Sequence, residues 1–322
     1  MTKFKVLYPL QGNRHSKFRG PGFNNKIIYT GGRREEGVFL SKEIIVYFQG
    51  MPTFSPGIQW VVQRNLTHVA DFNNLRLSCE EAGIYFQAID IIPFSPDLPV
   101  FDTSRRSIIY GSTTFCNLAA TDQELKTGLF FDEARFSIGN YFQRWGKYML
   151  NYGAVITTFE ELMSRDVLPE QLFFIRPDDD SKSFSGEIKS FGEISRWYEQ
   201  LKMVENTNLS PDSAIVVSDP WQIRYEWRLW IVEGKVVAAS KYRTDFKLTK
   251  ERGCPEEVIT FAENRCAEYT PHDVFVMDVC LCGEELFIVE CGCMNAEGFY
   301  HADIGAIVTA VSRYFAGLDI RK

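Results

Sequence analysis

The sequence lacks the short motifs on which several large enzyme classes depend. It contains no G-x-x-x-x-G-K-[ST], no G-x-G-x-x-G, no H-E-x-x-H, no C-x-x-C and no G-x-S-x-G. The H-R-D and D-F-G motifs of protein kinases are missing as well. Each motif supplies a phosphate cradle, a metal site or a nucleophile, so its absence argues against the class that uses it. Only 4 histidines occur in 322 residues, which disfavours histidine-based nucleophilic catalysis.

A second group of absences concerns location and partners. No apolar run reaches the length of about 18 residues that a membrane-spanning helix needs, so we expect no membrane partner. The N-terminal segment has no apolar stretch typical of a signal peptide. We therefore expect a cytoplasmic protein whose 8 cysteines are reduced thiols. The net charge of −7 disfavours a general nucleic-acid-binding protein, which would normally be basic.

The chain is nevertheless rich in residues that build a folded core. Hydrophobic residues make up 45% and aromatic residues 14%, and the length fits two or three lobes. Residues 12–36 break this pattern and predict a long loop with one short strand at Ile27–Tyr29. Two interpretations of this loop stay open, a solvated insertion or an arm that binds an anionic acceptor. Its cations are Arg14, Lys17, Arg19, Lys26, Arg33 and Arg34.

Strand and helix patterns alternate at first and then give way to hairpins. Residues 75–91 predict a helix, a glycine stop and a strand, and residues 106–115 predict a strand that runs into a turn. This alternation indicates an α/β domain over residues 1–118. Residues 119–215 predict a helical linker and a small α+β lobe, and residues 216–322 predict a second lobe built on two long hairpins.

The hairpin of residues 274–292 carries two carboxylates in apolar strands. A three-residue turn at residues 283–285 would place Asp278 directly opposite Glu290 on one face of the sheet, whereas a two-residue turn would place them on opposite faces. Opposed carboxylates repel unless a cation lies between them. Together with the amide of Asn295, they would form a set of hard oxygen ligands suited to magnesium held with substrate phosphates.

Cations accompany these carboxylates elsewhere in the sequence. In the hairpin of residues 226–243, the period of two places Glu226 and Arg228 on one face and Lys241 with Arg243 on one face of the returning strand. Arg176 ends an apolar strand, and Lys182 lies in the Ser/Gly loop that follows. Such cations suit a polyphosphate, although a solvated strand edge would carry similar charges.

Three segments taken together resemble a known family. They are FFIRPDDDSKSFSG (173–186), EWRLWIVEGKVVAASKYR (226–243) and VECGCMNAEGFYHAD (289–303). They resemble the ATP-grasp superfamily, and more narrowly its clade marked by an arginine and two lysines, over roughly residues 120–322. The resemblance implies an α/β pre-ATP-grasp-like domain followed by an α+β ATP-grasp fold, whose two lobes clamp a nucleotide.

The resemblance also implies residue roles, with ATP and Mg²⁺ as cofactors. Arg176 and Lys182 would lie beside the phosphates, and Val216, Val217 and Ser218 would form the hinge strand against adenine. Glu226 would contact the ribose or hold Arg228, and Arg228 and Lys241 would face the γ-phosphate as catalytic cations. Asp278, Glu290 and Asn295 would bind magnesium. The sequence departs from the common Glu-x-Asn pattern of the family, because Gly292 stands where that asparagine is expected.

The activity implied is that of an ATP-dependent carboxylate–amine (or thiol) ligase that forms an acyl phosphate and ADP. Its partners would be small-molecule or peptide substrates, with Arg105, Arg106 and the Ser112–Thr114 turn as candidate acceptor contacts. One alternative is a nucleotide-binding protein without catalysis. Another is a nucleotidyl-transferring nucleic-acid ligase, which is disfavoured because no K-x-D-G motif supplies the lysine that takes AMP.

Overall fold

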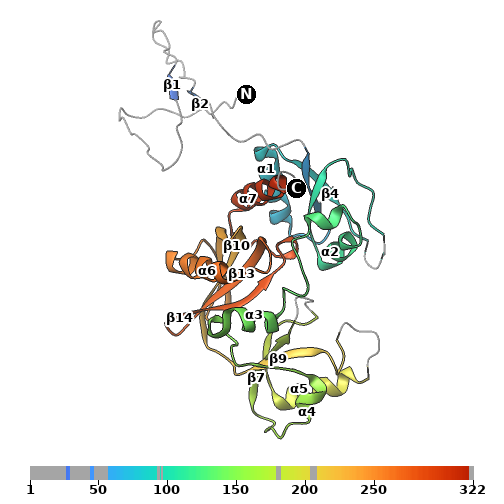
Figure 1. Cartoon of the computed structure of the whole chain (residues 1–322), viewed down its shortest axis with the longest axis vertical. Helices are drawn as coiled ribbons and strands as arrows, with labels where there is room; N and C mark the ends of the chain where they lie inside the picture. Colours follow the sequence, from blue (N-terminus) through green and yellow to red (C-terminus); the bar gives the residue numbers. More distant parts are fainter. Residues whose placement is uncertain are drawn as a thin grey trace, which may run out of the picture. The chain divides into compact units, whose positions relative to one another are not determined.

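The computed structural model describes residues 27–29, 44–46, 57–92, 95, 97–178, 183–203 and 209–318 (Figure 1). The chain divides into two compact units, Met1–Thr53 and Phe54–Lys322. In the first unit, strand β1 (Ile27–Tyr29) pairs antiparallel with β2 (Ile44–Val46). The short strand predicted at Ile27–Tyr29 is therefore confirmed. The cations predicted in this loop, from Arg14 to Arg34, lie outside the described residues.

The second unit begins with a three-stranded parallel sheet in the order β4-β3-β5. Strand β3 leads through helix α1 to β4, and α1 ends at Gly83, whose φ of 69° is the left-handed conformation that glycine adopts without strain. The predicted alternation of strand and helix is confirmed. The elements of this region are β3 (Ile58–Gln63), α1 (Val69–Ala82), β4 (Tyr85–Ile89), β5 (Arg106–Tyr110), α2 (Thr113–Ala120) and the 3₁₀ helix η1 (Leu125–Gly128).

A four-stranded antiparallel sheet follows, in the order β6-β9-β7-β8. Two of its helices begin with capping boxes, in which Thr158 and Ser190 each satisfy a backbone N–H of the first turn. Ile175, Ile194 and Ile215 form the centre of its core. The elements are β6 (Val155–Thr158), α4 (Phe159–Met163), β7 (Leu172–Pro177), β8 (Glu187–Ser190), α5 (Phe191–Leu201) and β9 (Ala214–Ser218).

The largest sheet has five antiparallel strands in the order β12-β11-β10-β13-β14. Residues 229–232 and 274–277 of its central strands are apolar on both faces, because helices cover each face there. On one face, Leu229 and Ile231 pack in a core with α3 and α6, while Trp230 on the other face packs in a core with α7. The strands are β10 (Ile223–Val232), β11 (Lys235–Thr244), β12 (Lys247–Arg252), β13 (Val274–Cys282) and β14 (Glu285–Gly292).

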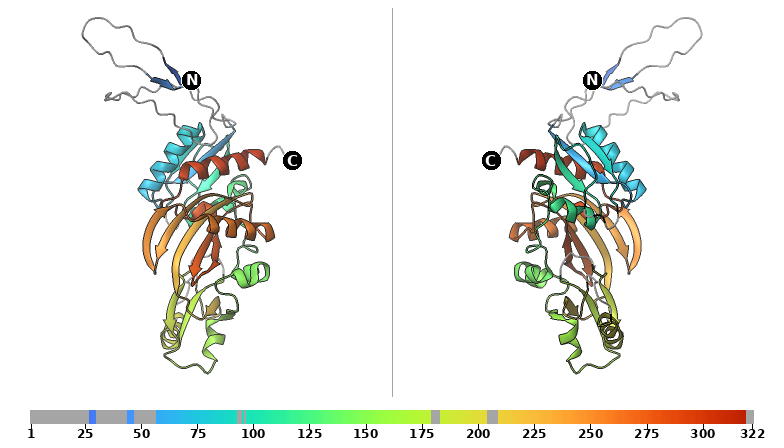
Figure 2. Two further views of the ribbon diagram at one scale, coloured as in Figure 1. Left: turned by 90° about the vertical axis from the view of Figure 1, so that its left-hand side faces the viewer. Right: turned by 90° about the vertical axis from the view of Figure 1, so that its right-hand side faces the viewer.

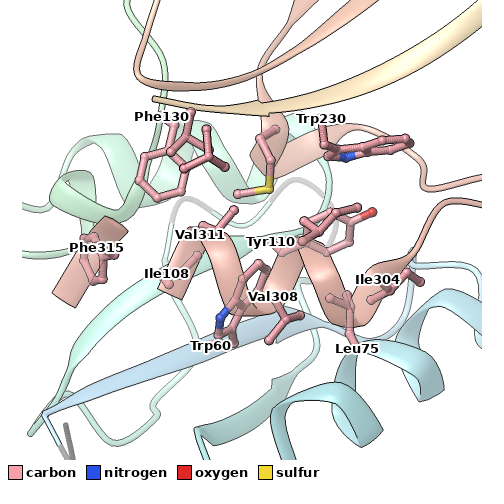
Figure 3. Packing of buried hydrophobic residues seen from close by; sticks show 14 of the residues in the cluster. Trp60, Leu75, Ile108, Tyr110, Phe130, Trp230, Ile304, Val308, Val311 and Phe315 are labelled. Atoms are coloured by element: carbon pink, nitrogen blue, oxygen red, sulfur yellow. The ribbon is translucent and has the colours of Figure 1, made fainter. Parts of the chain in front are cut away.

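The last helix of the chain returns to the first sheet. Helix α7 (Ile304–Gly317) lies beside α1 (Figures 1 and 2). Its residues Val308 and Val311 belong to a core that also contains Trp60, Phe130 and Trp230 from the three-stranded and five-stranded sheets and the segment between them (Figure 3). The indole N–H of Trp60 donates to Ser312 Oγ at 2.9 Å. The remaining helical elements are α3 (Ile138–Trp145), η2 (Gly146–Tyr148), α6 (Glu256–Glu268) and η3 (Met294–Ala296).

The architecture confirms an α+β fold that follows an N-terminal α/β region. The three sheets lie one after another along the chain, whereas α7 returns to the first of them. The boundaries predicted near residues 118 and 215 stay predictions. Within the described residues, every helix is too short or too polar to cross a membrane.

The contact between η1 and β5 yields a stability prediction. A Cβ at Gly128 would lie 1.7 Å from the carbonyl oxygen of Ser107, so Gly128→Ala must push η1 away from the sheet. We expect the variant to lose about 2–3 kcal/mol of unfolding free energy in urea titrations. Gly317→Ala is the control, because its Cβ meets no atom within 4 Å. Equal stability of the two variants would contradict this packing.

Candidate functional site

One cavity of about 670 Å³ is lined by both the four-stranded and the five-stranded sheets. One part of its wall is apolar and comes from Leu150, Phe174, Phe184, Ile188, Trp221 and Ile223. The other part is charged and comes from Arg176, Glu187, Glu226, Arg228, Arg243, Asp278, Glu290 and Glu297. A flat apolar group and a polyanion could therefore bind side by side in this cavity.

Asp278 and Glu290 lie opposite each other in the second hairpin, but the turn differs from the one that the sequence predicted. Cys282 pairs with Glu285, so the turn has two residues and the predicted three-residue turn is wrong. The pairing then shifts between Val279 and Asp278, which leaves Val289 as an extra residue in β14. This β-bulge restores the register in which Asp278 lies opposite Glu290. Their predicted juxtaposition is therefore confirmed.

A second bulge separates two cations that were expected to share a face. Glu226 pairs with Arg243 and the next residue, Trp227, pairs with Lys241, so Tyr242 is the extra residue in β11. Tyr242 and Arg243 both line the charged cavity. The expectation that Lys241 shares a face with Arg243 is wrong, because the bulge interrupts the period of two.

Lys241 instead lies on the opposite face of the sheet. It lines a smaller cavity of about 380 Å³ together with Tyr225 and Trp227, and its ammonium group pairs with Glu251 at 2.9 Å. The structure therefore does not bring Lys241 to the charged cavity. Arg243, which was not assigned a role in the site, lines the charged cavity.

Arg228 is the centre of the charged wall and is buried between two carboxylates. Its Nε and Nη2 donate to the two oxygens of Asp278 at 2.9 and 2.8 Å, which is a bidentate pair. Its Nη1 donates to Glu297 Oε2 at 2.5 Å. Burial alone would lower the pKa of the Arg228 guanidinium, but Asp278 and Glu297 raise it well above the ordinary value. Arg228 is therefore a permanently charged group inside the protein.

Tyr242 links two carboxylates of the charged wall, Glu226 and Asp278. Its hydroxyl lies 2.8 Å from Glu226 Oε2 and 3.2 Å from Asp278 Oδ2, within donating distance of both. Burial and the two carboxylates raise the pKa of Tyr242 well above its ordinary value, so the hydroxyl keeps its proton. Glu226 also accepts from Arg243 at 3.4 Å. Its described partners are thus Tyr242 and Arg243 rather than Arg228.

Arg176 joins the four-stranded sheet to the five-stranded sheet. It projects from β7, and its Nη2 donates to Glu290 Oε2 on β14 at 2.5 Å. The strand predicted as the hinge lies next to it, since Val216 pairs with Arg176 in the sheet. Val216 and Val217 are buried, and Ser218 Oγ donates to Asn151, which lines the cavity. Lys182 lies outside the described residues.

Asn295 is placed differently from its predicted role. Its amide N–H groups donate to the carbonyls of Ile109 and Gly128 at 2.5 and 2.8 Å, and its amide oxygen accepts the N–H of Phe130 at 2.8 Å. The side chain is fully buried and does not line the charged cavity. It fixes β5 and η1 to η3, so the structure does not support Asn295 as a metal ligand.

The remaining donor set fits magnesium bound together with phosphates. Across the described parts of the chain, no three His, Cys, Asp or Glu side chains converge to hold a metal by themselves. Magnesium is usually held by one or two carboxylates with substrate phosphates and waters, and Asp278 with Glu290 matches that requirement. Burial raises the pKa of Asp278 to about 6; Arg228 opposes this rise, and Glu290 and Glu297 add to it.

Two cavity residues that hydrogen-bond directly to Arg228 or Asp278 were missed by the sequence reasoning. Glu297 follows η3, where neither strand nor helix periodicity applies, and Tyr242 reaches the cavity only through a bulge. The sequence did carry one indication of Glu297, which is the glycine at residue 292 in place of the family's common asparagine. A Cβ there would lie 2.7 Å from Glu297 Oε1, so the glycine leaves the space that this carboxylate occupies.

Comparison with known proteins identifies the class. Residues 121–311, more than half of the chain, match the model of an ATP-grasp domain, family 3 of the clade named for its arginine and two lysines. The protein therefore belongs to this ATP-grasp family, as the resemblance of its motifs indicated.

One solved structure supports the fold, and a second is similar at a lower score. A RimK-domain ATP-grasp protein from Sphaerobacter thermophilus aligns with a TM-score of 0.51 at 11% identity, covering 80% of this chain and 98% of that one. D-alanine–D-alanine ligase from Bacillus anthracis aligns with a TM-score of 0.48 at 13% identity, covering 82% and 98%. At such identities the first likeness shows the ATP-grasp fold alone. No curated protein matches the chain.

The buried position of Arg228 yields a prediction with a pH dependence. Arg228→Met would leave Asp278 and Glu297 without their buried cation and should lower the free energy of unfolding at pH 7 by about 3–5 kcal/mol. A carboxyl whose pKa is raised by folding takes up a proton in the folded state first, so folded stability falls as the pH rises through that pKa. The deficit should therefore be smaller at pH 5 than at pH 7.

Urea titrations at the two pH values measure this difference. Lys235→Met is the control, because Lys235 pairs with Glu263 at the exposed surface and should contribute less than about 1 kcal/mol at either pH. A deficit for Arg228→Met that grows toward pH 5 would contradict the assignment of charges.

Proposed function

We propose that this protein is an ATP-dependent ligase that joins a carboxylate to an amine or a thiol through an acyl phosphate, with release of ADP. The observation that carries the proposal is the cavity in which an apolar wall adjoins Arg176, Arg228, Asp278 and Glu290. The residues that line it match the two needs of phosphoryl transfer. These needs are fixed cations for the phosphates and carboxylates for a divalent ion.

Binding of the nucleotide would divide between the two kinds of wall. The adenine would lie against the apolar side chains, among them Trp221 and Ile223, close to the strand of Val216, Val217 and Ser218. Along β10, Glu226 lies between Ile223 and Arg228, and this position suits a contact to the ribose hydroxyls. Ile223, Glu226 and Arg228 would thus supply apolar and charged contacts from neighbouring positions on β10.

The cations would position the phosphates and stabilise the charge that develops on them. Arg176 and Arg228 approach the cavity from different sheets, and Arg243 adds a half-exposed guanidinium at its wall. Asp278 and Glu290 would hold magnesium, which when bound neutralises charge on the transferring phosphoryl group. Fixed charges of this kind stabilise a transition state without reorganisation, which is the main contribution a protein makes to this reaction.

The reaction would proceed in two displacements. An oxygen of the substrate carboxylate attacks the γ-phosphorus, the bond to the β-phosphate oxygen breaks, and ADP leaves. The nitrogen or sulfur of the acceptor then attacks the acyl carbon, phosphate leaves, and the acceptor loses one proton. No histidine or cysteine nucleophile is needed, in agreement with the scarcity of histidine.

The nucleotide products distinguish this proposal from its alternatives. The protein is incubated with Mg-ATP and an extract of small molecules and peptides, and ADP and AMP are separated by chromatography. We expect ADP that depends on the extract, and a fall of at least about a hundred-fold in Asp278→Asn/Glu290→Gln, since the metal carboxylates are lost. Glu263→Gln, which changes a surface carboxylate, should retain the wild-type rate.

Other outcomes identify what is wrong. AMP in place of ADP would overturn the acyl-phosphate route and favour adenylyl transfer. Unchanged ADP formation in the double variant would show that Asp278 and Glu290 do not hold the metal ion. ATP binding without turnover in any extract fraction would favour a nucleotide-binding protein.

A further inference from the structure

Arg228 and the proposed metal compete for the same carboxylate. Both oxygens of Asp278 are bonded to Arg228, yet Asp278 is also one of the two carboxylates assigned to magnesium. A metal ion that binds Asp278 draws electron density from its carboxylate, which weakens these hydrogen bonds. Because Arg228 is almost fully buried, its charge would then be less well compensated, which is unfavourable.

We propose that Glu297 is a positioning residue that takes over Arg228 when Asp278 binds the metal. This inference rests on the proposed function. Glu297 already bonds Nη1 of Arg228 at 2.5 Å, on a guanidinium nitrogen that Asp278 does not use. A shift of Asp278 toward the metal therefore leaves one charge-assisted hydrogen bond in place, and the guanidinium stays compensated and directed at the cavity.

The backbone of Glu297 is fixed from outside the five-stranded sheet. Its carbonyl oxygen accepts the hydroxyl of Tyr110 at 2.8 Å, and Tyr110 ends strand β5 of the first sheet. The side chain is buried, as are those of Arg228 and Asp278. Glu297 therefore holds its position through contacts that a metal at Asp278 and Glu290 would not disturb.

Gly292 provides the space for this carboxylate. A Cβ at residue 292 would lie 2.7 Å from Oε1 and 3.1 Å from Cδ of Glu297. An asparagine at residue 292 and Glu297 in its present place therefore exclude each other. Gly292 stands where the family commonly has an asparagine that binds the metal. In this protein the Glu297 carboxylate occupies the space beside Gly292 and pairs with Arg228.

A double-mutant cycle on metal binding tests the inference. Free Mn²⁺ is measured by electron paramagnetic resonance in titrations of the full chain with ADP present. Glu297→Gln should weaken Mn²⁺ binding by about ten-fold or more, because Arg228 then has only Asp278 to pair with. In the Arg228→Met background the same change should alter the affinity by less than about two-fold, because no buried cation is left to hold.

Gly292→Ala gives an independent test that leaves every charge in place. The new Cβ displaces the Glu297 carboxylate, so this variant should weaken Mn²⁺ binding as Glu297→Gln does, and combining the two should add little. Gly317→Ala, far from the cavity in sequence and in an open environment, should bind Mn²⁺ like the wild type. Circular dichroism confirms that each variant is folded before titration.

Three results would overturn the inference. An equal loss from Glu297→Gln with and without Arg228 would make Glu297 a direct metal ligand. An unchanged affinity in Glu297→Gln would give it no role in the site. If the wild type binds no Mn²⁺ with ADP, the proposed function fails first and this inference falls with it, whereas Mn²⁺ binding without ligation leaves the inference standing.

Discussion

The pair of Arg228 and Asp278 is the interaction on which the rest of the site depends. A guanidinium and a carboxylate on adjacent central strands are both buried, and each would lose its main compensating charge without the other. Around this pair the protein places Glu297 and Tyr242, each bonded to one of its members. Arg176 and Glu290 repeat the arrangement across two sheets. Without a nucleotide, the two arginines suited to phosphates are therefore paired with the two carboxylates suited to magnesium. The protein thus already holds the charges that a magnesium nucleotide would need.

The sequence was sufficient for the class of fold and for part of the site. Alternating apolar residues located the long hairpins, and the motifs around Arg176, Arg228 and Glu290 indicated the ATP-grasp family. These inferences succeeded because burial on a strand leaves a regular pattern that a single sequence displays. The meeting of Asp278 and Glu290 has another origin, because the two-residue turn and the bulge at Val289 together give the register that a three-residue turn would have given.

The errors share one physical origin, which is irregular backbone. The bulges at Val289 and Tyr242 each change the face of a strand, and neither has a glycine or proline to mark it. The bulge at Val289 brings Glu290 opposite Asp278, although the two-residue turn alone would have placed them on opposite faces. The bulge at Tyr242 removes Lys241 from the cavity. Asn295 and Glu297 follow the last strand, where no period predicts direction. The amide was used for backbone contacts, and the carboxylate two residues later entered the cavity.

Helix α7 has a consequence for how the chain acquires its fold during synthesis. Trp60 and Ser312 are 252 residues apart in sequence yet share a buried hydrogen bond. The apolar face of the first sheet is thus translated early, and it meets its covering helix only after residue 317 has left the ribosome. Until then this face is an exposed apolar surface on a nascent chain, the kind of surface that chaperones bind. The part of the second unit that is made first is therefore among the last to reach its final packing.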